Sequence, residues 1–212
     1  KALTTTSTDA ITMTVNAEAS SAATQASDLV SLNGKTNQVI TMTAVTKVSG
    51  SYADLLDVYV TNAGQYNGEG DEAVTITGTV TAAQADAIAD VTSGVVTATI
   101  DADTASALNA ALSDAQVNAY TLTISAGSAA ATDLTSLDSK TSVAVNAAAV
   151  TVITGSATEV AAAYAANPTT IITGLGNENV EITGTTVATL EELKAINNAT
   201  SGTITLNTQS IN

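Results

Sequence analysis

The chain has 212 residues, with 20 Asp and Glu against 5 Lys and Arg, a formal net charge of −15 and a pI near 4.1. So few basic side chains argue against nucleic-acid binding, which needs phosphate contacts, and against binding to an anionic membrane surface. His, Cys, Trp and Phe are absent and aromatic residues make up 2%. Catalysis by His or Cys is therefore excluded, and a core must be built in thin layers of Ala, Val, Ile and Thr.

A strand in which apolar residues alternate with Thr, followed by a corner, recurs along the whole chain. These strands are expected to end at corners near Asn16, Gly50, Gly78, Ala102, Gly127, Gly155 and Gly184, with a last strand ending at Asn207. The intervals between neighbouring ends run from 23 residues (Gly184 to Asn207) to 34 residues (Asn16 to Gly50). A nearly constant period in this range is typical of repeat proteins.

Ala-rich segments with helix signals follow these corners. Capping boxes, in which a Ser or Thr is followed three residues later by Glu or Gln, are expected at Thr81 with Gln84, Ser156 with Glu159 and Thr189 with Glu192. Ser51 and Asp103 are expected to cap two further helices, and a helix over residues 17–32 should end at Gly34. Residues 91–94 and 199–202 share the ending Thr-Ser-Gly, which is independent support for a repeat.

A strand–helix–strand crossover places successive strands parallel and is right-handed. The repeats therefore predict an α/β fold: a right-handed solenoid of about seven strand–corner–helix coils with a parallel sheet. We expect one elongated domain over residues 1–212 that belongs to a longer chain or to an assembly. A compact doubly wound α/β fold is the alternative, although such short helices with small side chains would cover only one face of a sheet. Segments 39–43, 143–145 and 171–173 could add short strands to the main sheet or build a second one.

The polar positions of the predicted strands form a candidate surface. If the apolar residues face the helices, their Thr neighbours point outward and stack about 4.8 Å apart. The Thr ladder predicted in this way comprises Thr41, Thr43, Thr75, Thr77, Thr97, Thr99, Thr121, Thr123, Thr203 and Thr205. The ladder is either a self-bonded sheet face or a flat recognition surface for ice, for carbohydrate or for another copy of the protein. Its Thr-x-Thr spacing resembles that of insect β-solenoid antifreeze proteins, which lack interleaved helices.

The loop at residues 67–72 is the candidate metal site. Glu69, Asp71 and Glu72 lie with two glycines in a short segment, and Ca²⁺ prefers such hard oxygen donors on a flexible backbone. The alternative is a solvated acidic turn. Asp101 and Asp103 make a weaker candidate, since Asp103 is also expected as a helix cap.

Nothing in the sequence predicts an enzyme. Glu191 and Glu192 are explained by a first helical turn, and Gly174-Leu-Gly176 lacks the rest of a nucleotide-binding fingerprint. Tyr52, Tyr59 and Tyr66 lie seven residues apart, so on a helix they would share one face and contribute to the core.

Residues 74–100, VTITGTVTAAQADAIADVTSGVVTATI, resemble Thr/Ala-rich repeats of very large surface and extracellular proteins of marine bacteria and cyanobacteria, and of structural proteins of their phages. The resemblance implies a structural protein of the cell or virion surface that associates with other copies of itself, such as an S-layer, adhesin-stalk or filament subunit. A phage fibre or appendage protein, and a binding module whose Thr face takes ice or carbohydrate, are the alternatives. No site residues are carried over.

Overall fold

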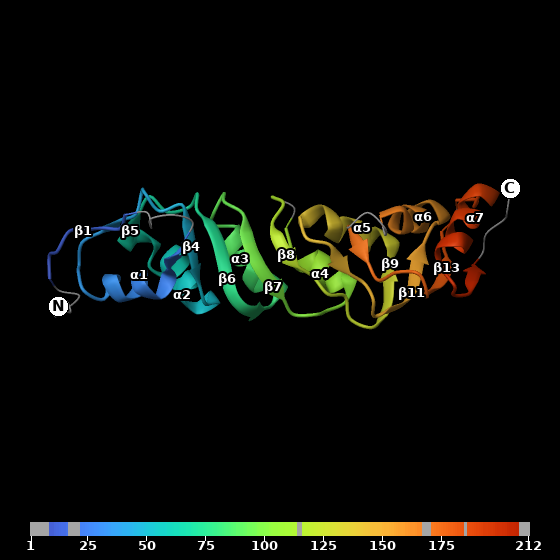
Figure 1. Cartoon of the computed structure of the whole chain (residues 1–212), viewed down its shortest axis with the longest axis horizontal. Coiled ribbons are helices and arrows are strands. Elements are labelled where there is room, and N and C mark those ends of the chain that lie inside the picture. The colour runs from blue at the N-terminus through green and yellow to red at the C-terminus, as the bar shows by residue number, and fades with distance from the viewer. Residues whose placement is uncertain (1–8, 17–21, 114–115, 167–170, 185, 208–212) are drawn as a thin grey trace. The chain divides into compact units, whose positions relative to one another are not determined.

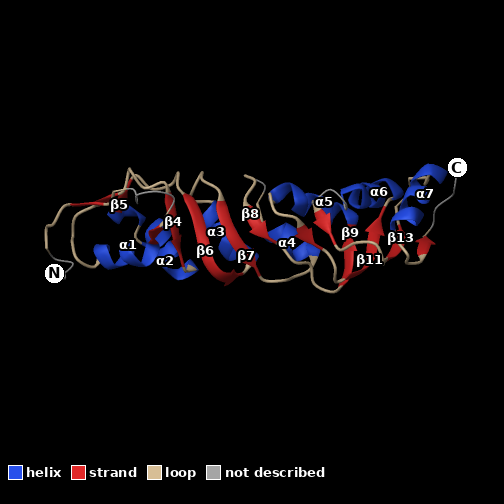
Figure 2. Cartoon of the chain, viewed as in Figure 1, coloured by secondary structure: helices blue, strands red, loops and turns tan. Residues whose placement is uncertain are grey.

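The computed structural model describes residues 9–16, 22–113, 116–166, 171–184 and 186–207. Over these residues it has an α/β fold in which seven α-helices accompany sheets of parallel strands (Figures 1 and 2). The chain divides into two compact units, unit 1 at residues 1–99 and unit 2 at residues 100–212. The prediction of one elongated domain over residues 1–212 stays a prediction.

Unit 1 contains two parallel sheets. One has the order β1-β3-β5, with the strands β1 (Met13–Thr14), β3 (Ile40–Thr41) and β5 (Tyr66–Asn67). The other begins β2-β4-β6-β7, with the strands β2 (Thr24–Gln25), β4 (Lys47–Gly50), β6 (Ala73–Val80) and β7 (Val96–Ile100).

The helices of unit 1 follow strands of its second sheet. They are α1 (Ala26–Asn33), α2 (Tyr52–Leu56) and α3 (Ala82–Ala89). The cap at Ser51 and the capping box of Thr81 with Gln84 are confirmed, because each side chain accepts the expected backbone N–H. α2 continues as a π-helical turn, η1 (Asp57–Thr61), and a 3₁₀ turn, η2 (Ala63–Gln65).

Unit 2 repeats the arrangement. Its larger sheet has the order β14-β13-β11-β9, with the strands β9 (Gly127–Ala130), β11 (Val150–Gly155), β13 (Asn179–Ile182) and β14 (Ile204–Leu206). β10 (Val145–Asn146) pairs with β12 (Ile172–Thr173), and β8 (Ala119–Thr121) precedes β9. The helices are α4 (Ala105–Ala111), α5 (Ala131–Lys140), α6 (Ala157–Ala166) and α7 (Leu190–Ala199).

Alternating burial in the strands explains how so few large side chains make a core. Val74 and Ile76 in β6 are buried, and the intervening Thr75 is exposed. In β13, Val180 and Ile182 are buried in the same way. One face of each strand thus packs on the helices, and each layer buries only a thin set of Val, Ile, Leu and Ala side chains.

Several expectations are corrected. The described strands do not form a single sheet: they fall into separate sheets, none of which curls. The three short segments belong to the small sheets, as β3, β10 and β12. Gly78 does not end its strand, because β6 continues to Val80 through a positive φ of 83° at the glycine. Gly127 begins a strand instead of ending one.

Two predicted residue roles also change. Thr104, not Asp103, caps α4, and the Asp103 carboxylate accepts the Thr104 N–H at 2.7 Å. Tyr66 does not share a helix face with Tyr59, because the π-helical and 3₁₀ turns end the helix and Tyr66 starts β5. Both Tyr side chains are buried, as a core role requires.

Candidate functional site

In the acidic loop before β6, the carboxyl group of Glu72 points into the protein interior. Glu72 is fully buried, with 0% of its surface exposed. Its Oε2 accepts the Gly70 N–H at 2.8 Å and the Tyr59 hydroxyl at 3.2 Å. Its Oε1 is also buried and has no hydrogen-bond partner among the described atoms. The side chain thus ties the loop to the π-helical turn of the same unit.

Unit 2 contains the same arrangement before β13. Glu178 is 1% exposed and accepts the Tyr164 hydroxyl at 2.9 Å. Its two carboxylate oxygens accept the Gly176 N–H at 2.7 and 3.0 Å. Tyr164 lies on α6, so here too an aromatic hydroxyl from the preceding helical segment meets a carboxylate at the start of a strand.

A Thr-Ser-Gly turn binds the backbone of each of these loops. In unit 1 the Thr92 hydroxyl donates to the Glu72 carbonyl at 2.7 Å and accepts the Gly94 N–H at 3.0 Å. The Ser93 N–H donates to the Gly70 carbonyl at 2.8 Å. We call this set the first clasp, formed by Tyr59, Gly70, Glu72, Thr92, Ser93 and Gly94.

The second clasp has the same bonds at nearly the same lengths. The Thr200 hydroxyl donates to the Glu178 carbonyl at 2.7 Å and accepts the Gly202 N–H at 2.9 Å. The Ser201 N–H donates to the Gly176 carbonyl at 2.9 Å. The second clasp comprises Tyr164, Gly176, Glu178, Thr200, Ser201 and Gly202. Each clasp holds two successive strands of its sheet together at their starts.

Buried Thr residues make the same backbone link at two other turns, without the carboxylate. The Thr36 hydroxyl donates to the Ile11 carbonyl at 2.6 Å. The Thr141 hydroxyl donates to the Tyr120 carbonyl at 2.8 Å and accepts the Val143 N–H at 3.1 Å. A buried Thr after a helix is therefore a general device for joining one repeat to the preceding one.

The clasps predict a loss of stability at alkaline pH. Burial, together with the charge of Glu72, raises the pKa of Tyr59 well above 10, and burial with Glu178 nearby raises the pKa of Tyr164. Below pH 10 both phenols keep their protons whether the chain is folded or unfolded. Above it the unfolded chain releases them first, so folding should weaken by up to about 1.4 kcal/mol per pH unit for each phenol.

Thermal melts between pH 8 and the alkaline limit test this expectation. The Tyr59→Phe/Tyr164→Phe variant should show a shallower decline in melting temperature than the parent. Equal slopes in parent and variant would mean that other groups, such as Tyr66 with its pKa raised to about 12 by burial, cause the decline.

The predicted calcium site is not assembled. Glu72 faces the core, whereas Asp71 is exposed and Glu69 is half-buried. Among the described residues, no group of three or more acidic, His or Cys side chains is placed to hold a metal ion. Neither interpretation of the loop, a Ca²⁺ site or a solvated acidic turn, anticipated a buried Glu72 whose Oε2 accepts the Gly70 N–H and the Tyr59 hydroxyl.

The predicted Thr positions are all exposed or half-buried. They are Thr41, Thr43, Thr75, Thr77, Thr97, Thr99, Thr121, Thr123, Thr203 and Thr205. The registers nevertheless mix other side chains into the rows: Gln25 pairs with Ser49, which pairs with Thr75. In unit 2 the carboxylate of Glu181 lies between two Thr. The sheet faces are therefore polar surfaces of mixed chemistry, and their use in recognition stays a prediction.

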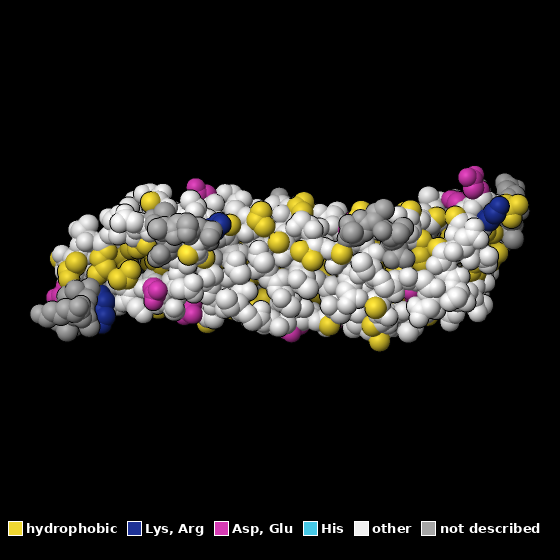
Figure 3. Space-filling view, viewed as in Figure 1, with side chains coloured by type: hydrophobic (Ala, Val, Ile, Leu, Met, Phe, Trp, Pro, Cys, Tyr) yellow, Lys and Arg dark blue, Asp and Glu magenta, His cyan; other side chains and the backbone are white. Residues whose placement is uncertain are grey.

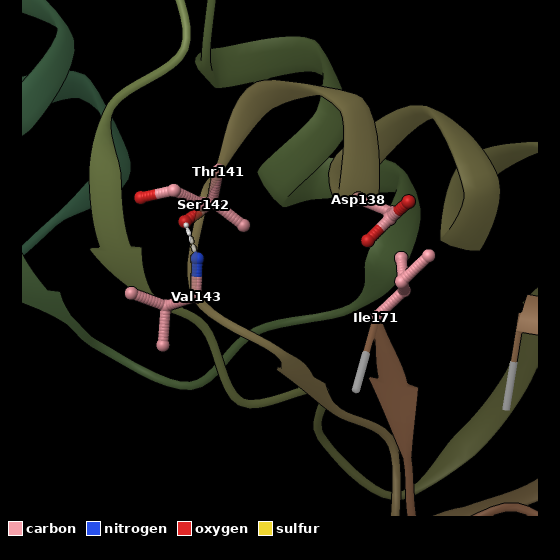
Figure 4. Close-up of a pocket in the computed structure, with 5 residues that line it drawn as sticks. All are labelled: Asp138, Thr141, Ser142, Val143 and Ile171. Carbon is pink, nitrogen blue, oxygen red and sulfur yellow. Dashed lines mark hydrogen bonds between the residues drawn. The ribbon is translucent and has the colours of Figure 1, made fainter. Parts of the chain in front are cut away.

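A cavity of about 260 Å³ in unit 2 lies at the end of α5 (Figure 4). Asp138, Thr141, Ser142, Val143 and Ile171 line it. Burial raises the pKa of the Asp138 carboxyl. The Ser142 hydroxyl points away from Asp138 in Figure 4 and donates to the Asn118 carbonyl at 3.2 Å, so the two side chains do not form a nucleophile–base pair.

Sequence reasoning missed the buried polar residues. Lys140 donates to the carbonyls of Asn109 at 2.8 Å and Leu112 at 2.6 Å, and thereby satisfies the end of α4 from α5. No local pattern marks it. The two Glu could have been found, because Gly-x-Gly-Asp/Asn-Glu occurs at residues 68–72 and 174–178, ahead of each Thr-Ser-Gly turn.

No helix among the described residues is both long and apolar enough to cross a membrane. The chain was also compared with protein-family models, curated proteins and solved structures, and none of them matches it.

Proposed function

We propose that this chain is a structural protein of a cell or virion surface that associates with copies of itself, and that it carries no catalytic activity. The observation that carries this proposal is where its reactive groups lie. The buried carboxylates and phenols of both clasps are engaged within the protein, and they join one repeat to the next. The buried carboxylates and phenols of the clasps thus hold neighbouring repeats in register.

The proposal includes a right-handed solenoid as the arrangement of the repeats. Parallel strands with intervening helices recur in both units, and crossovers of this kind are right-handed. Such an architecture leaves strand edges at its first and last repeats, which favours association.

The registers favour this function over a binding module for ice or carbohydrate. A face that matches the repeating lattice of ice or of a crystalline polysaccharide needs like side chains at a regular spacing, whereas these registers place Gln, Ser and Glu beside Thr. On the face drawn in Figure 3 the surface consists largely of uncharged polar side chains and backbone, without a concentrated charged patch.

Sedimentation velocity across a dilution series, followed by electron microscopy of the most concentrated sample, tests the proposed function. We expect reversible association that grows with concentration. The Thr75→Lys/Thr77→Lys variant should associate as the parent does, because both side chains lie on the exposed sheet face. A parent that stays monomeric throughout would refute self-association. Carbohydrate or ice binding that this variant abolishes would support the binding module instead.

A further inference from the structure

The last repeat of unit 2 leaves an apolar groove open to solvent. The groove encloses about 410 Å³ between α7 and β14 and is lined by Leu190, Leu193, Lys194, Asn197, Ile204 and Leu206. Leu190 is 69% exposed, the largest value among the large hydrophobic side chains of the described residues. An apolar side chain that projects so far beside a hollow is typical of a surface that another chain covers.

β14 also presents a hydrogen-bonding edge to which no described strand is paired. It lies at the end of its sheet in the order of the described strands, with β13 on one side. The Thr203 carbonyl and the Asn207 N–H bond to β13. Because backbone groups in a parallel strand alternate between its two edges, those of Ile204 and Leu206 point to the other edge. The groove therefore combines apolar side chains with backbone groups that no described strand pairs and that another strand can bind.

Comparison with the neighbouring strand β13 shows that the apolar residues of β14 are incompletely buried. Ile204 is in register with Val180, and Leu206 with Ile182. Val180 and Ile182 are completely buried, whereas Ile204 and Leu206 are only half-buried. One more strand and one more helix, added as β14 and α7 are added to β13 and α6, would complete the burial.

The first repeat of unit 1 presents the matching surface. Among the described strands, β2 lies at the edge of its sheet and pairs in parallel with β4. Val30 and Leu32 on α1 are half-buried, as are Ile11 and Met13 around β1. This repeat thus has a partly open apolar layer and a parallel strand edge, like the last repeat.

We propose that the groove between α7 and β14 takes the first repeat of a second copy of this chain, with β14 pairing in parallel with β2 and α7 packing on α1. This inference rests on the proposed self-association and specifies its surfaces. The contact continues the one already made between repeats inside each unit, where parallel strands pair and successive helices pack. The groove lining carries Lys194, which is opposite in charge to the exposed Asp28 of α1, and Glu191 and Glu192 in the first turn of α7 have the same sign as Asp28.

The two surfaces differ, so the contact is heterologous. Each copy that docks through its first repeat still offers its groove to another copy, and addition can continue. Association should therefore produce a series of growing species instead of stopping at a dimer.

Three variants that each add one negative charge test the proposal. Leu190→Glu places a carboxylate in the groove and Val30→Glu places one on α1, whereas Val117→Glu changes a valine that is 55% exposed and belongs to neither surface. In sedimentation velocity, Leu190→Glu and Val30→Glu should weaken association by roughly tenfold or more, and Val117→Glu should behave as the parent. Circular dichroism melts confirm folding. If Val30→Glu unfolds, Ser31→Glu replaces it at an exposed position of α1 and should weaken association by adding the same negative charge.

Mixing the variants tests the polarity of the contact. Leu190→Glu keeps an intact first repeat and Val30→Glu keeps an intact groove, so the mixture should form dimers and nothing larger. Association of Leu190→Glu at the strength of the parent would overturn this inference and leave the proposed self-association standing. A mixture that stays monomeric, or that grows like the parent, would also overturn it. A parent that never associates would refute both.

Discussion

Replacement of Gly94 by Ala should destabilise unit 1 by about 3–4 kcal/mol, and Gly202→Ala should do the same to unit 2. An ideal Cβ on Gly94 would lie 2.1 Å from the Glu72 carbonyl oxygen, and one on Gly202 would lie 2.0 Å from that of Glu178. Backbone atoms cannot turn aside as a flexible side chain does. The strand starts must therefore separate, and the Thr-to-carbonyl bond of the clasp is lost with them. Urea unfolding monitored by circular dichroism measures the loss.

Gly64→Ala is the matched control. Gly64 also lies in unit 1, has no atom within 4 Å of its ideal Cβ and has no positive φ. Its replacement should change the free energy of unfolding by less than about 1 kcal/mol. A loss in Gly94→Ala no greater than in Gly64→Ala would show that the two strand starts are not held as closely as the clasp requires.

Replacement of Glu72 by Ala should cost about 2–4 kcal/mol. The change leaves the Gly70 N–H and the Tyr59 hydroxyl without their acceptor in a buried place, and each unsatisfied donor costs about 1–3 kcal/mol. Glu72→Gln should cost less, because its amide oxygen can still accept one of these bonds. Glu178→Ala should reproduce the loss in unit 2.

Glu69→Ala provides the comparison for this series. Glu69 is half-buried in the same loop, so its loss should be within about 0.5 kcal/mol of neutral. The two replacements also separate the clasp from the predicted calcium loop. If Glu69 and Glu72 both bound a cation, the melting temperature of both variants would no longer respond to Ca²⁺. The buried position of Glu72 predicts instead that only Glu72→Ala loses stability, and that it does so with or without Ca²⁺.

Local chemistry explains which parts of the fold could be predicted from the sequence. The capping boxes of Thr81 with Gln84 and Thr189 with Glu192 formed as expected, because each needs only four consecutive residues. The in–out alternation of β6 was equally visible, since a strand with one buried face has a period of two. Both features are set within a single repeat.

The clasp could not be predicted in the same way. Glu72 and Thr92 lie 20 positions apart in the sequence, and the direction of the Glu72 side chain depends on where Tyr59 lies. That position in turn depends on a π-helical turn, which has no reliable sequence signal. An acidic, glycine-rich loop usually indicates solvent or a cation, so the pattern favoured the wrong surroundings for Glu72.

The spacing of the two clasps indicates the length of the segment that is duplicated in this chain. Glu72 and Glu178 are 106 residues apart, and Gly94 and Gly202 are 108 apart, whereas single repeats recur at intervals of 23 to 34 residues. Such a pattern is expected when a segment of several repeats has been duplicated as a whole. The duplicated module is then a segment of about 106 residues that contains several repeats and one clasp. A longer or shorter relative should differ from this chain by whole modules of that length.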